Sequence, residues 1–192
     1  DYAVTGVQTC ALPISEVARD LPTAITLATS DAELGKELVQ SLGSRAFRPY
    51  LSDDMAGAEV GGAIKNVIAI ACGIVMGRKL GDNARAALIT RGLAEMARLA
   101  LAKGGRAETL MGLSGLGDLT LTCTGLQSRN HSLGVALGEL QVLADILASR
   151  RSVAEGVPSS RAAAALARRL GIEMPIVAAV EAILHRGAGI DA

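Results

Sequence analysis

The sequence GGAIKNVIAIA at residues 61–71 lies inside a longer segment, residues 55–76, in which nearly every residue is apolar or small. A helix that is apolar on all its faces has to be buried, so we expect this segment to form the central helix of a packed domain. A membrane span is the alternative, but the uninterrupted apolar run at residues 67–76 is about half of the ~20 residues that a bilayer requires. The sequence therefore predicts a core helix and no membrane span. The polar residues that interrupt the segment are Glu59, Lys65 and Asn66.

The rest of the chain after this segment also has the pattern of helices. Asp82 or Asn83 can cap a helix that runs to about Lys103 and ends at the following glycines. The glycine-rich stretch SGLGDLTLTCTG at residues 114–125 instead predicts an irregular loop with a closely approached backbone. Other helices are expected at residues 106–111, 129–137, 142–149, 158–170 and 175–185, the last two with proline at the first helical position.

The residues before the central segment have a different pattern. PTAITLATS at residues 22–30 reads as a strand, and the next segment as a helix capped by Asp31 and ended by Gly43. Residues 47–51 offer a second strand. This strand–helix–strand unit is expected to be the remnant of an open α/β sheet, and the predicted fold class is mainly α.

Composition excludes several classes of function. The 192 residues include 19 basic and 19 acidic side chains, so no overall field attracts polyanions. Two tyrosines and one phenylalanine leave few rings for stacking on bases, so no nucleic-acid partner is expected. The three cysteines have no spacing typical of a zinc site or a disulfide framework, which favours a reducing, cytoplasmic location.

The N-terminal residues are set aside from this interpretation. VTGVQTCALPI at residues 4–14 looks like the translation of a DNA sequencing adapter, and it lacks the positive region of a signal peptide. We therefore expect residues 1–15 to be non-native, residues 16–53 to be the end of an α/β domain, and residues 54–192 to be a helical domain that is truncated at its end.

Lys65 is the first candidate for chemistry. An ammonium inside an apolar helix is desolvated, which favours its neutral form and suits a group that exchanges protons. The alternative is that the flexible side chain reaches the surface. Gly61 and Gly62, one turn earlier, permit close approach of a ligand or another backbone, and Asn66 adds an amide that could hold a substrate oxygen.

Two later segments carry the other candidates. Asp118 lies in the glycine-rich stretch and could converge with nearby threonines on Lys65 or a ligand, or it could simply cap a turn. QSRNHS at residues 127–132 places Arg129 at a helix start, an arrangement that suits a phosphate. His131 reads as a lone exposed histidine, and Glu155 either accepts hydrogen bonds from a ligand or is an ordinary solvated loop residue.

Five separated blocks, taken in order, resemble the bacterial NAD(P)-dependent glycerol-3-phosphate dehydrogenases. The similarity runs from about residue 16 to about residue 185, and agreement in content, order and spacing makes it more specific than any single motif. The blocks are GGAIKNVIAI at 61–70, LGDNARAALITRGLAEMARL at 80–99, GLSGLGDLTLTCTGLQSRN at 112–130, SVAEGV at 152–157 and LGIEMPI at 170–176.

The resemblance implies a Rossmann dinucleotide-binding domain followed by a helical substrate-binding domain. The implied reaction is the reduction of dihydroxyacetone phosphate to sn-glycerol 3-phosphate, and its reverse, with NAD or NADP as cofactor and a link to glycerophospholipid synthesis. Lys65 is implied as the catalytic acid/base. The implied substrate-binding residues are Lys65, Asp118, Thr122, Ser128, Arg129 and Asn130, and the implied cofactor-binding residues are Arg129, Val153 and Glu155.

The sequence also departs from that family. It contains no Gly-x-Gly-x-x-Gly, the turn that brings a backbone against the cofactor pyrophosphate. Residues 140–142 and the final RGAGIDA are unlike the family pattern. The 192-residue chain is therefore expected to be inactive alone, with a homodimer as one expected assembly. Two other hypotheses stay open, a two-domain dehydrogenase of unphosphorylated hydroxy acids and a non-enzymatic helical interaction module.

Overall fold

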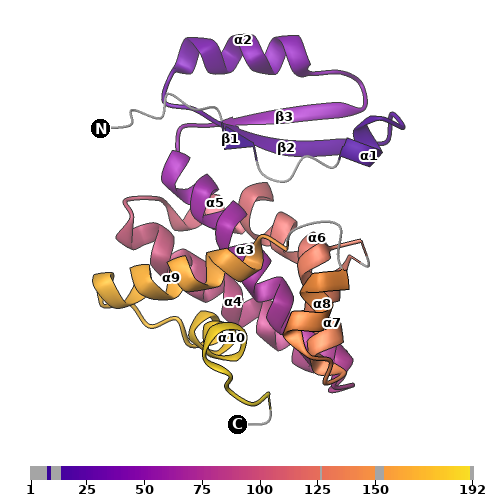
Figure 1. Ribbon diagram of the computed structural model, residues 1–192. Helices are drawn as coiled ribbons and strands as arrows, with labels where there is room; N and C mark the ends of the chain where they lie inside the picture. The colour runs from indigo at the N-terminus through magenta and orange to yellow at the C-terminus, as the bar shows by residue number, and fades with distance from the viewer. Residues whose placement is uncertain (1–7, 10–13, 126, 150–153, 191–192) are drawn as a thin grey trace.

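The computed structural model describes residues 8–9, 14–125, 127–149 and 154–190. A small sheet unit lies at one end of the molecule, and a larger body of helices follows it (Figure 1). The elements are β1 (Gln8–Thr9), α1 (Ile14–Val17), β2 (Thr23–Ala28), α2 (Ala32–Leu42), β3 (Phe47–Ser52), α3 (Met55–Gly77), α4 (Asp82–Ala102), α5 (Ala107–Met111), the π-helical turn η1 (Leu113–Gly117), α6 (Asp118–Thr124), α7 (Arg129–Gly138), α8 (Leu143–Ser149), α9 (Gly156–Leu170) and α10 (Pro175–Arg186).

The sheet unit confirms the predicted strand–helix–strand remnant. β2 and β3 pair in parallel, and α2 connects them across one face of the sheet (Figure 1). The Asp31 side chain accepts hydrogen bonds from the backbone N–H groups of Glu33 and Leu34 at the start of α2, and Gly43 is the C-cap. β1 pairs antiparallel with β2. β1 falls within residues 1–15, whose non-native origin stays a prediction.

The helical body is built around α3, as the sequence predicts. Helices α4, α6, α7 and α9 pack against α3, and most of its residues from Gly57 to Ile74 are buried. By length and composition alone α3 could cross a membrane, but 67% of its most apolar window is buried inside the protein. The uninterrupted run at residues 67–76, which the sequence analysis used, is therefore shorter than the apolar part of this helix. Its packing partners are those of a core helix.

Glycines let α7 lie directly on α3. A Cβ atom added at Gly73 would lie 2.1 Å from the carbonyl oxygen of His131, and one added at Gly134 would lie 2.1 Å from that of Ile70. Gly77 and Gly138 repeat the contact one turn further along. No side chain fits between the two backbones here. The contact fixes the first turn of α7 beside the middle of α3.

The glycine-rich stretch is helical, so the prediction of an irregular loop was wrong. Residues 113–117 form η1 and residues 118–124 form α6. The glycines serve close packing: a Cβ atom added at Gly115 would lie 2.0 Å from the carbonyl oxygen of Leu110, and one added at Gly61 would lie 2.1 Å from that of Ser114. The close backbone approach expected here is thus present, within helices.

The junction between β3 and α3 is held by two carboxylates. Asp54 caps α3 by accepting from the backbone N–H of Gly57 at 2.8 Å, and it also accepts from the backbone N–H of Arg106 at 2.9 Å. Asp53 forms an ion pair with the Arg106 guanidinium. Burial pushes the pKa of Asp54 up, but hydrogen bonds from Thr109, Gly57 and Arg106 outweigh burial and lower the pKa. The start of α3 is therefore tied to the segment that leads into α5.

Candidate functional site

Lys65 and Asp118 form a buried ion pair between α3 and α6. The Lys65 ammonium donates to Asp118 Oδ2, and the two residues are only 7% and 6% exposed. The alternative in which Lys65 reaches the surface is therefore wrong, as is the alternative in which Asp118 only caps a turn. The carboxylate stabilises the ammonium that burial alone would disfavour. The ion pair holds the Lys65 side chain at one position in the core.

Thr122 supports Asp118 from one turn further along α6. Its hydroxyl donates to the backbone carbonyl of Asp118 at 2.6 Å and lies 3.4 Å from Asp118 Oδ1. The carboxylate is therefore contacted by Lys65 on one oxygen and by Thr122 on the other. Of the convergence on Lys65 that the sequence suggested as one option, Asp118 reaches the lysine, whereas Thr122 contacts Asp118.

A chain of buried amides begins at the residue next to Lys65. The Asn66 side chain donates to the carbonyl oxygen of Gly62 at 3.2 Å and accepts from Asn130 Nδ2 at 3.0 Å. Asn130 Oδ1 in turn accepts from the backbone N–H of Gly156 at 2.9 Å. This network joins α3, α7 and the start of α9. The sequence suggested that the Asn66 amide could hold a substrate oxygen; in the structure this amide is hydrogen-bonded to Gly62 and Asn130.

The segment predicted to bind phosphate lies at the N-terminus of α7. The Ser128 hydroxyl accepts from the backbone N–H of His131 at 3.2 Å and so caps the helix. Arg129 lies 3.3 Å from Glu155, measured from Nη2 to Oε1, with side chains 52% and 60% exposed. Glu155 is therefore paired rather than merely solvated. Val153 lies outside the described residues.

His131 differs from its predicted exposed state. It is 4% exposed, and its Nε2 atom has no hydrogen-bond partner within the part of the chain that the structure describes. Burial, with a smaller contribution from the Arg85 charge, lowers the pKa of the imidazole. The burial of His131 could not be predicted from the sequence pattern, because the first turn of α7 is hydrophilic and yet packs against α3.

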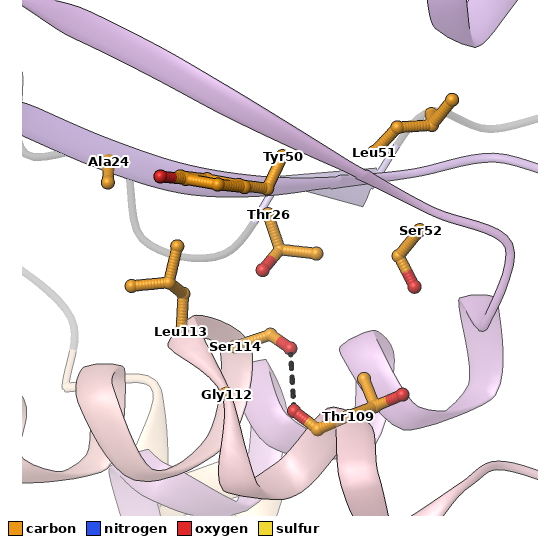
Figure 2. A pocket seen from close by; sticks show the side chains of 9 residues that line it. All are labelled: Ala24, Thr26, Tyr50, Leu51, Ser52, Thr109, Gly112, Leu113 and Ser114. Carbon is orange, nitrogen blue, oxygen red and sulfur yellow. Dashed lines mark hydrogen bonds between the residues drawn. The ribbon is translucent and has the colours of Figure 1, made fainter.

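A cavity of about 420 Å³ separates the sheet from the helical body. Figure 2 shows side chains of β2 and β3 on one side and those of α5 and η1 on the other, with the Ser114 hydroxyl donating to the Thr109 carbonyl at 3.2 Å. η1 leads directly from Ser114 to Asp118, so the cavity lies one helical turn from the ion pair. Sequence reasoning missed it because three distant segments form it. Its lining residues are Ala24, Thr26, Tyr50, Leu51, Ser52, Thr109, Gly112, Leu113 and Ser114.

Residues 54–192 match the family model described as "NAD-dependent glycerol-3-phosphate dehydrogenase C-terminus". The chain belongs to this family. It is 59% identical over 177 residues to the glycerol-3-phosphate dehydrogenase [NAD(P)+] of Parvibaculum lavamentivorans, a match that covers 92% of this chain and 53% of the relative. It is 62% identical to the enzyme of the same name from Rhodospirillum rubrum, over 88% of this chain and 48% of the relative. The chain thus spans about half the length of these relatives.

The fold has the same family likeness. The crystal structure of glycerol-3-phosphate dehydrogenase from Coxiella burnetii superposes with a TM-score of 0.90 at 47% identity, covering 95% of this chain and 56% of that chain. The mainly helical fold with an α/β remnant, expected from the resemblance, is confirmed. The described residues that the resemblance implies lie in three places. Lys65, Asp118 and Thr122 contact one another between α3 and α6, Asn130 lies in the amide network with Asn66 and Gly156, and Ser128 and Arg129 begin α7, with Arg129 paired to Glu155.

Proposed function

We propose that this chain is the substrate-binding, acid/base part of an NAD(P)-dependent glycerol-3-phosphate dehydrogenase that interconverts dihydroxyacetone phosphate and sn-glycerol 3-phosphate. The buried Lys65–Asp118 pair carries the proposal, because it offers one proton at a fixed place inside a family whose relatives are named for this reaction. A cytoplasmic location fits the two buried free thiols.

The reduction adds one hydride and one proton to a carbonyl group. Reduced NAD or NADP supplies the hydride when it is bound. Lys65 donates the proton from Nζ to the carbonyl oxygen, and in the oxidation direction its neutral amine takes that proton from the hydroxyl. Asp118 accepts a hydrogen bond from Lys65 Nζ and fixes the direction of the side chain. Thr122 holds the second carboxylate oxygen, so both act as positioning residues.

The N-terminus of α7 is the proposed phosphate site. Arg129 supplies a guanidinium there, and the helix dipole adds positive potential. Ser128, whose oxygen accepts from a backbone N–H, keeps its own hydroxyl proton available for a phosphate oxygen. Asn130 is buried in the amide network, which supports a role in placing α7 against α3.

The residues proposed to contact the cofactor fit its polar groups. Glu155 is exposed beside Arg129, so its carboxylate can accept hydrogen bonds from an amide or a ribose hydroxyl while Arg129 remains close to an anion. Val153 completes this proposed group. The Gly-x-Gly-x-x-Gly turn that would cradle the pyrophosphate does not occur in the 192 residues.

The test is a fusion that joins the unmatched part of the Parvibaculum lavamentivorans relative ahead of Glu16. We expect Lys65→Ala to lower kcat for dihydroxyacetone phosphate by about 10²–10⁴-fold, because the proton donor is lost. The exposed Lys103→Ala serves as the matched control and should retain turnover. The readout is oxidation of NADPH dependent on dihydroxyacetone phosphate. Near-normal turnover of Lys65→Ala would support the helical interaction module instead.

The same fusion separates the phosphate substrate from an unphosphorylated hydroxy acid. Removing a charge-assisted contact costs about 1.5–3 kcal/mol, so Arg129→Ala should raise KM for dihydroxyacetone phosphate by roughly ten- to a hundredfold. An unchanged KM would contradict the phosphate site and favour the hypothesis of a dehydrogenase of unphosphorylated hydroxy acids.

A further inference from the structure

The amide network has one direction from end to end. It begins at the backbone N–H of Gly156, which donates to Asn130 Oδ1 at 2.9 Å. Asn130 Nδ2 donates to Asn66 Oδ1 at 3.0 Å, and Asn66 Nδ2 donates to the carbonyl oxygen of Gly62 at 3.2 Å. A backbone N–H only donates and a carbonyl oxygen only accepts, so both side-chain amides have to point the same way. Asn66 and Asn130 are buried, so a partner lost from the network is not replaced by bulk water.

The network connects the three parts of the proposed site. Each of its buried members is adjacent in sequence to a residue that is proposed to act on the substrate or on the cofactor. Because neighbours share one backbone, a shift of a network member also displaces the site residue beside it. The adjacent pairs are Lys65 with Asn66, Arg129 with Asn130, and Glu155 with Gly156.

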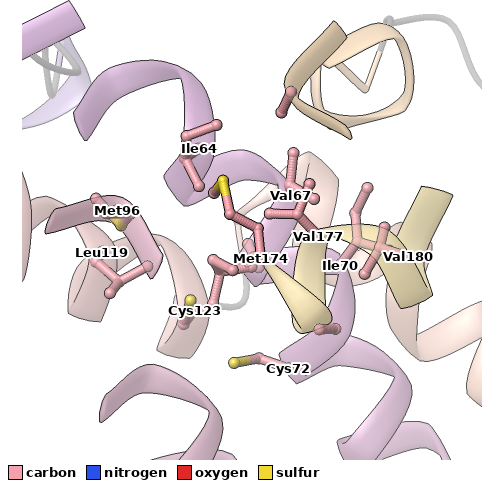
Figure 3. Packing of buried hydrophobic residues seen from close by; sticks show 14 of the residues in the cluster. Ile64, Val67, Ile70, Cys72, Met96, Leu119, Cys123, Met174, Val177 and Val180 are labelled. Atoms are coloured by element: carbon pink, nitrogen blue, oxygen red, sulfur yellow. The ribbon is translucent and has the colours of Figure 1, made fainter. Parts of the chain in front are cut away.

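Gly156 is the member with the least space around it. A Cβ atom added there would lie 2.7 Å from the carbonyl oxygen of Asn66, 2.8 Å from Ile70 Cδ1 and 2.9 Å from Asn130 Oδ1. The first of these atoms belongs to the backbone of α3, and Figure 3 shows Ile70 within the cluster of buried apolar side chains. Neither can give way easily in a packed core. A side chain at position 156 would therefore push the start of α9 away from α3 and lengthen the hydrogen bond to Asn130.

The hydrogen bond at Gly156 also serves the start of α9. Gly156 is the first residue of this helix, and the first N–H groups of a helix have no acceptor within it. Glu155 occupies the N-cap position but makes no side-chain hydrogen bond to the cap. Asn130, from α7, supplies an acceptor for the Gly156 N–H instead. The place of Glu155 at the start of α9 therefore depends on a side chain of another helix.

We propose that Gly156 is a positioning residue, which through the amide network holds the start of α9, and with it Glu155, in one position relative to Lys65 on α3. The network itself is independent of the reaction, whereas its consequence for turnover rests on the proposed function. In that function the carboxylate that contacts the cofactor and the amine that exchanges the proton have to be in place together. Gly156 acts through these neighbours and not on the reacting atoms.

The network is tested on the 192-residue chain without any activity assay. Hydrogen exchange of the nitrogen-15-labelled protein is followed at the Gly156 amide, and the Met96 amide in the middle of α4 is the reference for a general loss of stability. An amide in the first turn of a helix exchanges quickly unless an acceptor from elsewhere protects it. We expect Gly156 to be protected in the parent and to exchange roughly tenfold faster, relative to Met96, in Asn130→Ala.

Asn130→Asp is the matched control, because its side chain has nearly the same size and keeps an oxygen that accepts from Gly156. Its Gly156 amide should stay protected relative to Met96. The inference is overturned if the Gly156 amide of the parent exchanges as fast as an exposed amide, or if Asn130→Ala affects Gly156 and Met96 equally. The parent alone decides the first outcome, so the test stands even if a variant folds poorly.

The consequence for turnover is tested in the fusion. Gly156→Ala should lower kcat/KM for NADPH by about 10–100-fold, since a displacement of about 1 Å outside the reacting groups can cost that much. The dissociation constant of NADPH, measured by fluorescence titration, should rise as well. KM for dihydroxyacetone phosphate should change little, because Ser128 and Arg129 remain at the start of α7.

Ala164→Gly is the matched control for stability. It removes one methyl group from a buried position about two turns further along α9, so it destabilises the same helix and leaves Gly156 unchanged. It should lower Tm and leave kcat/KM for NADPH near that of the parent. Equal losses of kcat/KM in both variants would show a purely structural role and overturn the positioning role. An inactive parent fusion would instead contradict the proposed function, and the exchange experiment would still decide the network.

Discussion

Lys65 is buried in the core, where it forms an ion pair with Asp118 on α6. The sequence identified both residues and left two environments open for each. Lys65 could be buried or reach the surface, and Asp118 could approach Lys65 or a ligand, or only cap a turn. Position in an apolar helix is compatible with a side chain that snorkels and with one that is buried. The contact that decides between them joins residues 53 positions apart. Short-range pattern carries no information about such a contact.

At this scale we predict the stability effect of breaking the pair. Asp118→Ala leaves an unpaired buried ammonium and should reduce the free energy of unfolding by about 3–5 kcal/mol. The double variant Lys65→Met/Asp118→Leu removes both charges and should recover most of that loss, because well-packed apolar residues replace buried pairs at little cost. Urea unfolding of the 192-residue chain measures both. Equal losses in the single and double variants would contradict the pairing.

At the scale of elements, the helix positions were largely predictable and the character of residues 113–124 was not. Capping residues identify α2, an apolar segment identifies α3, and a starting proline identifies α10, because those signals are local. The glycines at residues 114–125 predicted an irregular, closely approached backbone; the close approach is present, as between Gly115 and the backbone of Leu110, but the backbone is helical. Whether such a stretch is helical depends on the backbones that pack against it. The burial of His131 was mispredicted because it likewise depends on a neighbouring helix, α3.

The α3–α7 contact gives a prediction with an internal control. Gly73→Ala places a methyl group 2.1 Å from the His131 carbonyl, and the helices must separate, at a cost of about 1–3 kcal/mol. Gly62→Ala is the same substitution in the same helix, with nothing within 4 Å of the new Cβ. It should instead add about 1 kcal/mol through helix propensity. Thermal or urea unfolding compares the two, and a similar sign for both would contradict the close contact.

The cap of α3 predicts a pH dependence. The pKa of Asp54 is lowered in the folded state, so its contribution to stability is complete above the pKa of the unfolded chain and is lost as pH falls through the folded pKa. Asp54→Asn should therefore destabilise at pH 7 and cost progressively less below about pH 4. Unfolding free energies of both proteins across pH 2–7 test this. A difference that stays constant over that range would rule out the titrating cap.

At the scale of the whole molecule, the family resemblance supplied what residue patterns could not. Composition excluded classes of function and helix patterns gave the architecture. The helix start suggested a phosphate at Arg129, and the ordered blocks added the expected roles of Ser128 and Glu155. The structure adds that Arg129 and Glu155 are paired across α7 and the residue before α9. The cavity between sheet and helices stayed unpredicted, because it is a property of packed segments rather than of any motif.

The whole chain also carries a prediction about activity. The purified 192-residue protein should not oxidise NADPH in the presence of dihydroxyacetone phosphate, because no Gly-x-Gly-x-x-Gly turn is present to hold the pyrophosphate. The fusion described above is the positive control. Steady, substrate-dependent NADPH oxidation by the unfused chain would show that this expectation is wrong. Analytical ultracentrifugation of the same sample tests the expected homodimer.

The junction at Asp53 and Asp54 has a consequence for motion. Two residues join β3 to α3, and both carboxylates are bonded to the Arg106 segment of the helical body. Such a connection is rigid and does not act as a hinge. The sheet unit and the helices should then diffuse and tumble as one particle, with a single rotational correlation time. In an enzyme built this way, ligands would enter through the movement of side chains and of short segments, with little swinging of whole domains.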